Sequence, residues 1–545
     1  MLHCTMTLAC GSPDGAPLDV IVDTAGATDT AAVDTTAPDA ALCESSCAEL
    51  DEPPCVKGAC FAGECQGFVV PDDPCDDEDE CTTADACLPD GRCFGELIRC
   101  PRVGLCQLST TCADRLCKDP LTPPTARCGN TADGYPRFCG SGDCARRLLA
   151  LGGGHTCALW GGRARCWGLN TNGQLGQGNT NSFGNDKLAY EAALLPVTGE
   201  IVQIAAGAAH TCVLLATGRV QCWGRGQYGA LGYGDTRDVG RDQQTKTAGN
   251  VLIGGFARDL AAGQDHTCVV LDDGSVRCWG IGEPAATTAA HLGNPANTAT
   301  IGDDEVPEAT APVVTGAEAA HVYCGARHTC ILTPVGKVRC WGMGGFGRLG
   351  YGNTDTIGDD EDPAAAGDVD VGDTVTALAL GAEHTCALLW DGRVRCWGRA
   401  LDGRLGYGDG LDVGDDETPA DKGDVPLLGS AIAIAAGVDH TCALLRTGAV
   451  QCWGSGANGK LGYGNTLNVG DTPEYLALEA GTVDLGDDAV WVALGAADGD
   501  HTCALLASGG LRCWGRGKDG ALGLGNSRSI GDDEVPAAVD EVQYQ

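Results

Sequence analysis

Short apolar stretches recur at a nearly constant spacing through residues 146–545. Each stretch begins with His-Thr-Cys and ends with Cys-Trp-Gly, and the chain contains seven of them. Successive histidines lie 55, 56, 62, 56, 56 and 61 residues apart. A period of this size indicates one small structural unit stacked several times. The seven histidines are His155, His210, His266, His328, His384, His440 and His501.

Residues 442–452 show the shape that one stretch predicts. Apolar residues stand on both sides of a polar loop formed by Arg446, Thr447 and Gly448. A three-residue hairpin loop requires a left-handed residue at its third position, where glycine is least costly. The sequence therefore predicts a β-hairpin. The same glycine recurs in six copies, as Gly218, Gly274, Gly336, Gly392, Gly448 and Gly509.

The first copy is one residue shorter, and its centre falls between Gly161 and Gly162, which predicts a two-residue loop. In both loop lengths the two cysteines face each other across the hairpin. Facing residues have Cα atoms about 4.5–5.5 Å apart, which a disulfide can bridge. We therefore predict seven cross-strand disulfides. The pairs are Cys157–Cys166, Cys212–Cys222, Cys268–Cys278, Cys330–Cys340, Cys386–Cys396, Cys442–Cys452 and Cys503–Cys513.

Two alternatives to these bridges remain open from the sequence. The cysteines could be buried free thiols, or they could bind zinc together with histidine. The zinc alternative is disfavoured because the repeats contain no Cys-x-x-Cys pair. Cys324 is left over after pairing, and we expect it to be a small buried residue.

Each hairpin is flanked by further short apolar segments. A segment such as residues 432–436 precedes it, and a glycine-rich turn, an acidic insert and a Pro/Val segment follow it. The strands are apolar on both faces, as strands covered on both sides are. Four short strands per repeat and seven repeats predict an all-β, seven-bladed β-propeller. An open β-solenoid is the alternative fold.

The pattern AAGxxHTCxLxxxGxVxCWGxGxxGxLGxG resembles the regulator of chromosome condensation repeat family. In the second copy the match includes residues 202–207, His210 and Thr211, residues 218–220, Trp223 and Gly224, and residues 229–232. The resemblance covers residues 146–540 and implies a seven-bladed propeller. It also implies that the His-Thr and Trp-Gly pairs are scaffold positions, not catalytic ones. The added cysteines depart from the family pattern.

The N-terminal part differs in composition. The chain holds 33 cysteines, 18 of them before residue 146, which favours an oxidising compartment. Residues 1–10 look like the remnant of an export or lipoprotein signal, with Cys10 as a lipidation candidate. Residues 11–42 predict a disordered Ala/Asp/Thr spacer. Residues 43–145 predict a small disulfide-rich module. Within it, the segment Cys75-Asp-Asp-Glu-Asp-Glu-Cys81-Thr-Thr-Ala-Asp-Ala-Cys87 resembles small modules of bacterial and slime-mould surface proteins. Its disulfide pairing is left open.

The charge balance limits the possible partners. The formal net charge is −39 and the isoelectric point is about 4.4, whereas a nucleic-acid interface needs a basic patch. We therefore expect no nucleic-acid partner. No segment is apolar and long enough to span a bilayer. We expect a monomeric extracellular or cell-envelope protein, such as a bacterial outer-membrane or surface lipoprotein. A lipid anchor at Cys10 and a mature N-terminus without lipid are the two alternatives for its attachment.

Acidic inserts follow most glycine turns. Several carboxylates in a glycine-containing loop are what calcium would use, but solvated acidic loops also give solubility without an ion. Calcium is thus a minor prediction, and no other cofactor is expected. The candidate ligands are Asp303, Asp304, Glu305, Asp359, Asp360, Glu361, Asp415, Asp416 and Glu417.

No catalytic motif stands out in the sequence, and we predict a protein that is not an enzyme. The long acidic loops are the candidate contact surface, because insertions at equivalent loops often build the binding face of a repeat protein. The leading hypothesis is a surface-displayed or secreted recognition propeller with a protein or glycan partner. The alternatives are guanine-nucleotide exchange, implied by the resemblance alone, and inhibition of a secreted enzyme.

Overall fold

The computed structural model describes residues 148–243, 245–282, 290–295, 299–495 and 499–545, and before them the backbone of eight short strands. The chain divides into two compact units, Met1–Gly129 and Asn130–Gln545. No helix among the described residues is long and apolar enough to cross a membrane.

The first unit contributes only short strands. Three of its antiparallel pairs place cysteines opposite each other: Cys60 faces Cys65, Cys87 faces Cys93, and Cys112 faces Cys117. The predicted divisions at 1–10, 11–42 and 43–145 stay predictions, and Cys10 lies outside the described residues. The strands are β1 (Cys4–Thr7), β2 (Val20–Val22), β3 (Val56–Phe61), β4 (Glu64–Val69), β5 (Thr82–Cys87), β6 (Cys93–Leu97), β7 (Thr111–Ala113) and β8 (Leu116–Lys118).

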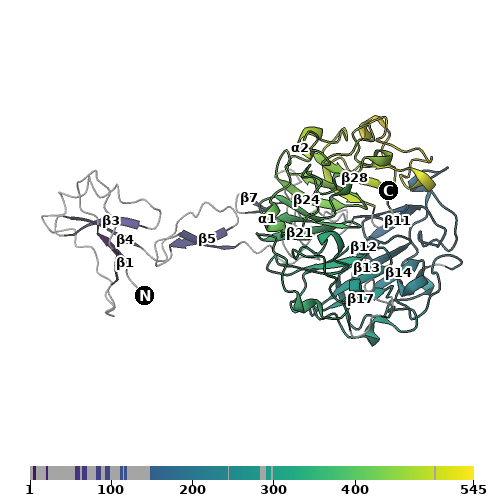
Figure 1. Cartoon of the computed structure of the whole chain (residues 1–545), viewed down its shortest axis with the longest axis horizontal. Helices are drawn as coiled ribbons and strands as arrows, with labels where there is room; N and C mark the ends of the chain where they lie inside the picture. Colours follow the sequence, from purple (N-terminus) through teal and green to yellow (C-terminus); the bar gives the residue numbers. More distant parts are fainter. Residues whose placement is uncertain are drawn as a thin grey trace. The chain divides into compact units, whose positions relative to one another are not determined.

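The second unit contains seven three-stranded antiparallel sheets, which are the seven blades of a propeller (Figure 1). In each blade the strand before His-Thr-Cys lies innermost, where it contacts the matching strands of adjacent blades. The first three blades are β9 (Leu149–Leu151), β10 (His155–Trp160) and β11 (Arg163–Gly168); β12 (Ile201–Ala206), β13 (His210–Leu215) and β14 (Val220–Gly224); β15 (Ala257–Ala262), β16 (His266–Leu271) and β17 (Val276–Gly280).

The remaining four blades follow in chain order, and two short helices, α1 (Pro419–Lys422) and α2 (Ala477–Ala480), lie in the loops between them. The strands are β18 (His321–Cys324), β19 (His328–Leu332) and β20 (Val338–Gly342); β21 (Val375–Leu380), β22 (His384–Leu389) and β23 (Val394–Gly398); β24 (Ala431–Ala436), β25 (His440–Leu445) and β26 (Val450–Gly454); β27 (Ala489–Leu494), β28 (His501–Leu506) and β29 (Leu511–Gly515).

The prediction of four strands per blade is wrong by one strand. The Pro/Val segment touches the outer strand at a single residue, as where Val425 N donates to Val394 O at 2.8 Å. Proline explains the short contact in two blades, since Pro426 follows Val425 and Pro312 precedes Val313. Proline offers no N–H to extend the ladder.

The hairpin turns are confirmed. The third loop residue is a left-handed glycine in each long copy, for example Gly392 with φ 89° and Gly448 with φ 86°. In the first copy Gly161 (φ 52°) and Gly162 (φ 73°) form a two-residue loop between Trp160 and Arg163. Both turn lengths keep the cysteines opposite each other.

All seven predicted cysteine pairs are joined as disulfides, with Cα atoms 4.0–4.1 Å apart. The bridges lie in the core together with the seven tryptophans of Cys-Trp-Gly, each of which is fully buried. Cys324 on β18 is half-buried, contrary to the expectation of a buried residue.

The ring closes between whole blades, a point that the sequence leaves open. Every sheet consists of consecutive strands, so no strand is exchanged between the two ends of the propeller. Figure 1 shows the first blade, in blue, beside the last blade, in yellow. Leu188 and Leu524 form a backbone bridge at this junction.

Candidate functional site

The seven histidines form a hydrogen-bonded circle around the propeller. Each histidine Nε2 bonds the threonine Oγ1 of the next blade at 2.7–3.1 Å, and His501 completes the circle through Thr156. Each threonine hydroxyl in turn donates to a backbone carbonyl of the preceding blade at 2.9–3.2 Å. The threonine oxygen therefore accepts from the histidine, which places the ring proton on Nε2.

Burial keeps these histidines neutral. Desolvation lowers the pKa of His155 to about 3 and those of His210 and His501 to about 4. Desolvation likewise lowers the pKa values of His266, His328, His384 and His440 well below the ordinary value. A neutral, fully buried imidazole with a fixed partner acts as a structural link between blades.

The carbonyls that anchor this circle belong to residues whose side chains differ from blade to blade. They precede Leu-Gly in the glycine-rich turn: Gln174, Ala230, His291, Arg348, Arg404, Lys460 and Ala521. In five blades the tryptophan Nε1 of the following blade donates to the same carbonyl at 2.9–3.1 Å. The scaffold thus fixes the backbone of this column and leaves its side chains free to vary.

A second variable column stands directly before His-Thr-Cys: Gly154, Ala209, Asp265, Arg327, Glu383, Asp439 and Asp500. These residues lie in the loops between the innermost and middle strands, so they surround the centre of one face. A third column follows Cys-Trp-Gly at the same ends of the sheets: Leu169, Arg225, Ile281, Met343, Arg399, Ser455 and Arg516.

The three columns break the sevenfold repeat in their charge. Blades 1–3 carry one cation and one carboxylate in these positions, Arg225 and Asp265, which pair with each other. Blades 4–7 carry six cations and three carboxylates, which we call the central charged arc. Its members are Arg327, Arg348, Glu383, Arg399, Arg404, Asp439, Lys460, Asp500 and Arg516.

Glu383 is the hub of one half of the arc. Its carboxylate lies 2.8 Å from Arg399, 3.5 Å from Arg404 and 3.7 Å from Arg348. Arg399 also stacks over Phe346, with its guanidinium carbon 4.6 Å from the ring centre. Asp402 adds a second carboxylate, 3.6 Å from Arg404. Three guanidinium groups beside two carboxylates leave a smaller excess of positive charge at this point.

Lys460 is the hub of the other half. Its Nζ lies 2.6 Å from Asp439 and 2.9 Å from Asp500, so one ammonium bridges blades 6 and 7. Arg516 adds a longer contact to Asp500, at 3.7 Å. Here two carboxylates share two cations.

Three cations of the arc are almost completely buried: Arg348, Arg404 and Lys460 are 3%, 4% and 1% exposed. Desolvation lowers the pKa values of Arg348 and Arg404. Burying charge is costly, and a buried ion pair is weak support for stability compared with apolar residues of the same size.

The arc was not predicted from the sequence, because the prediction rested on the residues that are the same in every repeat. The signal in the sequence is the change at the position before His-Thr-Cys, which is neutral in Gly154 and Ala209 and charged in the other five repeats.

The predicted calcium ligands do come together. Within Asp303–Asp304–Glu305, Asp359–Asp360–Glu361 and Asp415–Asp416–Glu417, and also within Asp532–Asp533–Glu534, the carboxylate oxygens lie within 4.8 Å of one another. Desolvation, then the hydrogen bond with Asp360, raises the pKa of Glu361 to about 7. Burial also raises the pKa values of Glu305 and Glu417. Calcium binding stays a prediction.

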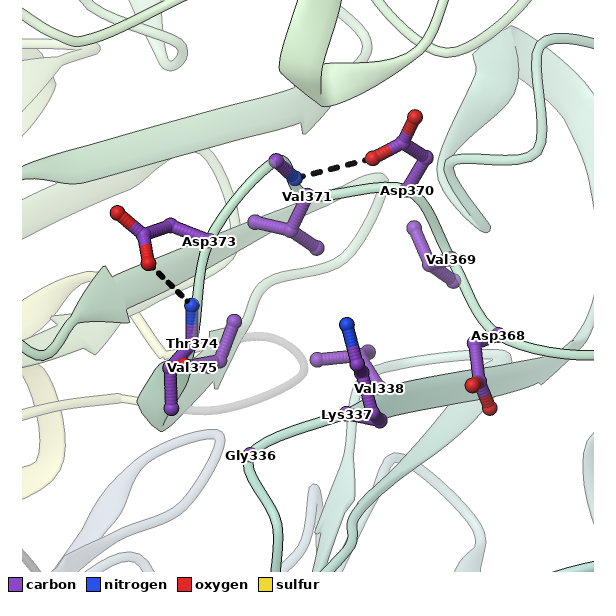
Figure 2. Close-up of a pocket in the computed structure, with 11 residues that line it drawn as sticks. Gly336, Lys337, Val338, Asp368, Val369, Asp370, Val371, Asp373, Thr374 and Val375 are labelled. Carbon is purple, nitrogen blue, oxygen red and sulfur yellow. Dashed lines mark hydrogen bonds between the residues drawn. The ribbon is translucent and has the colours of Figure 1, made fainter. Parts of the chain in front are cut away.

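The opposite face carries a depression of about 480 Å³ between blades 4 and 5. It is lined by residues 336–338 of one hairpin and by residues 368–375, which lead into β21. Figure 2 shows the Lys337 side chain reaching into it, with Asp370 and Asp373 bonded to the loop backbone. No motif in the sequence pointed to this place.

Comparison with solved structures supports the same architecture. Yeast RCC1 (Prp20), in a crystal structure with Kap60 bound to it, has a TM-score of 0.55 at 21% identity and covers 77% of this chain and 90% of that one. Human WBSCR16 has a TM-score of 0.53 at 18% identity, with 69% and 92% covered. Identities this low establish the fold alone.

Sequence relatives extend across most of the propeller. The ultraviolet-B receptor UVR8 of Arabidopsis thaliana is 29% identical over 390 residues, which are 70% of this chain and 79% of the receptor. The regulator of chromosome condensation of Xenopus laevis is 26% identical over 328 residues, 59% and 74% of the two chains. The human E3 ubiquitin-protein ligase HERC2 is 31% identical over 262 residues, which are only 5% of the ligase.

Family comparison agrees with these relatives. Residues 128–498 match the RCC1-like domain, and residues 498–521 match the regulator of chromosome condensation (RCC1) repeat. The first match alone covers more than half of the chain. The chain therefore belongs to the family of RCC1-like domain proteins.

Proposed function

We propose that this protein is an exported, non-enzymatic recognition propeller that binds a protein partner through the central charged arc. The observation that carries the proposal is the broken symmetry of that arc. All seven blades build the same circle of His-Thr bonds, yet only blades 4–7 place a dense set of charges beside it. The fold does not need these charges, because blades 1 and 2 hold together without them.

The charge of the arc defines the partner. Its six cations outnumber its three carboxylates, in a chain whose net charge is −39. A local positive region within an acidic molecule selects a partner that presents carboxylates and disfavours other contacts. The long acidic loops would then steer the partner away from the rim and towards the centre of the face.

Export is the second part of the proposal. Seven disulfides in one propeller suit an oxidising compartment. The cysteine-rich first unit and the lipidation candidate Cys10 would hold the propeller at the cell envelope. Similar proteins support protein recognition in general terms, since yeast Prp20 is bound to Kap60 in one solved structure and is described in another with its binding properties to Gsp1p and histones.

Affinity capture from the envelope fraction of the source organism tests the arc. The wild-type chain should recover a partner that the Arg327→Glu/Arg516→Glu variant fails to recover. Both arginines are exposed, so the fold should survive their replacement. The matched control is Arg163→Glu/Arg446→Glu, which changes two exposed arginines at the hairpin ends of the blades. Equal recovery by the arc variant would reject the arc as the binding surface.

The acidic loops need their own variant. Replacing Asp303, Asp304, Asp359, Asp360, Asp415 and Asp416 with asparagine removes most of their charge without deleting the backbone. If recovery is unchanged, the loops play no part in recognition. If recovery is lost while the arc variant still binds, the loops and not the arc form the surface.

Nucleotide exchange is the second candidate, favoured by the 26% identity with the Xenopus regulator of chromosome condensation. A nucleotide-release assay with small GTPases tests it. Accelerated release by the full chain would support exchange activity. Release at the spontaneous rate would leave recognition as the function.

A further inference from the structure

One hairpin tip differs chemically from the others. The first residue of the three-residue loop is Trp390 in blade 5, and this tryptophan is 65% exposed. The seven tryptophans of Cys-Trp-Gly are fully buried by contrast. The same loop position in the other long hairpins is occupied by Ala216, Asp272, Pro334, Arg446 and Ala507.

The exposed indole is held in place by hydrogen bonds. Trp390 Nε1 donates to Asp373 Oδ1 at 3.1 Å, and Trp390 N donates to Thr374 O at 3.1 Å. Asp373 is fixed in turn, because it accepts from Thr374 N at 2.8 Å and from Arg393 at 2.6 Å. An aromatic ring that is already ordered loses little conformational entropy when a ligand stacks on it.

Asp373, which accepts from the indole, and Thr374, whose carbonyl accepts from the Trp390 backbone, both line the depression of about 480 Å³ (Figure 2). On the far side, the tip of the neighbouring hairpin carries Val335, which is 73% exposed, and its next residue, Gly336, lines the depression. The volume lies within the roughly 300–1,000 Å³ of small-molecule sites. The tip of one hairpin thus lines a space large enough for a sugar ring, and Trp390 adjoins that lining through its hydrogen bonds with Asp373 and Thr374.

The polar groups of the depression are balanced in charge. Asp368 pairs with Arg339 at 2.6 Å, and Asp373 pairs with Arg393. With Asp370 and Lys337, these residues make three carboxylates and three cations. Arg393 also pairs with Asp391 at 2.6 Å and with Asp424 at 3.4 Å, so an anionic ligand gains no net attraction. A neutral ligand with many hydroxyl groups is different, because each hydroxyl can donate to a carboxylate and accept from an ammonium.

We propose that this depression, together with Trp390, is a saccharide-binding subsite that takes a neutral pyranose unit of a glycan. The apolar C–H face of the sugar stacks on the indole, and its hydroxyl groups bond Asp370, Asp373 and Lys337. The subsite is independent of the central charged arc. Strand β22 runs from His384, beside the arc, to Leu389, beside Trp390, so the two surfaces lie on opposite faces.

Saturation-transfer NMR and calorimetry on the full chain test the proposal with maltotriose, cellotriose, N,N′,N″-triacetylchitotriose and N-acetylarginine amide as probes. We expect saturable binding of one or more trisaccharides at millimolar concentration. Trp390→Ala should weaken that binding by about tenfold or more, whereas Trp390→Phe, which keeps an aromatic face, should retain most of it. The thermal midpoint should stay unchanged, because the side chain is exposed.

The matched control is Phe256→Ala, which removes another exposed aromatic residue from the propeller and should leave sugar binding unchanged. The proposal is overturned if no trisaccharide binds saturably, or if Trp390→Ala binds as tightly as wild type. Binding of N-acetylarginine amide without any sugar would also overturn it, in favour of a cationic ligand. Because the arc variants lie on the other face, loss of protein capture and loss of sugar binding are scored separately.

Discussion

Blades 1–3 and blades 4–7 share one scaffold but differ at the centre of one face. The hydrogen bonds from histidine to threonine and from threonine to a backbone carbonyl are the same all round the ring. The residues beside those bonds are almost all uncharged in the first three blades and charged in the last four. In this propeller the positions that build the scaffold are therefore distinct from the neighbouring positions whose charge varies from blade to blade, and we propose that the varying positions serve recognition.

Low pH should weaken the circle of His-Thr hydrogen bonds that all seven blades share, and we expect this change to have the largest effect on stability. The folded-state pKa values of the seven histidines lie far below 6.5, so the unfolded chain binds more protons between about pH 6.5 and 3. The stability that the neutral histidines contribute is therefore complete above pH 6.5 and falls as the pH drops through this window. Thermal unfolding between pH 7 and 4 measures the loss. NMR signals of these rings that titrate near pH 6.5 in the native protein would contradict the account.

Tryptophans of the same blade should differ in their contribution to stability. Trp397→Ala removes a fully buried side chain and should cost about 3–5 kcal/mol of unfolding free energy. Its matched control, Trp390→Ala, removes an exposed side chain and should change stability by no more than about 0.5 kcal/mol. Chemical denaturation measures both variants. Similar losses would mean that the exposed indole is part of the scaffold.

Removing one charge from the central charged arc should lower the stability of the propeller. Lys460→Met leaves Asp439 and Asp500 without their buried partner and should cost about 1–3 kcal/mol. Replacing all three residues, as Lys460→Gln with Asp439→Asn and Asp500→Asn, should restore stability because no unpaired buried charge is then left and blade 6, like blade 1, is uncharged in these columns. The same triple variant should lose partner binding. Lys518→Met, at an exposed lysine, is the control and should have little effect.

A substitution in an acidic insert should have the smallest effect on stability. The pKa of Glu361 is raised from 4.5 to about 7, so the folded state resists ionisation and wild type loses stability as the pH rises through this range. Glu361→Gln should therefore raise the thermal midpoint at pH 8 and leave it unchanged below pH 4.5. Calorimetry with Ca²⁺ tests the ion separately, and no heat at millimolar Ca²⁺ would reject the calcium prediction.

The scaffold could be predicted because its constraints act within a short segment. The symmetry of the two cysteines about Thr447 and the glycine at position 448 determine the hairpin register without reference to other blades. The predicted fourth strand is absent from the seven described sheets. Whether the segment at Val425 pairs further with the outer strand depends on the direction of the chain after Val425, which the local pattern does not determine. The arc and the Trp390 subsite depend on contacts between blades, such as Lys460 with Asp500, which no single repeat contains.

Mapping of the cysteines in the natively isolated protein tests the central claim most directly. After alkylation and digestion without reduction, mass spectrometry should find the seven cross-strand pairs of the propeller, from Cys157–Cys166 to Cys503–Cys513, protected as disulfides. Free, alkylated thiols at all of these positions would contradict the account, and the proposal of an exported recognition propeller would be abandoned.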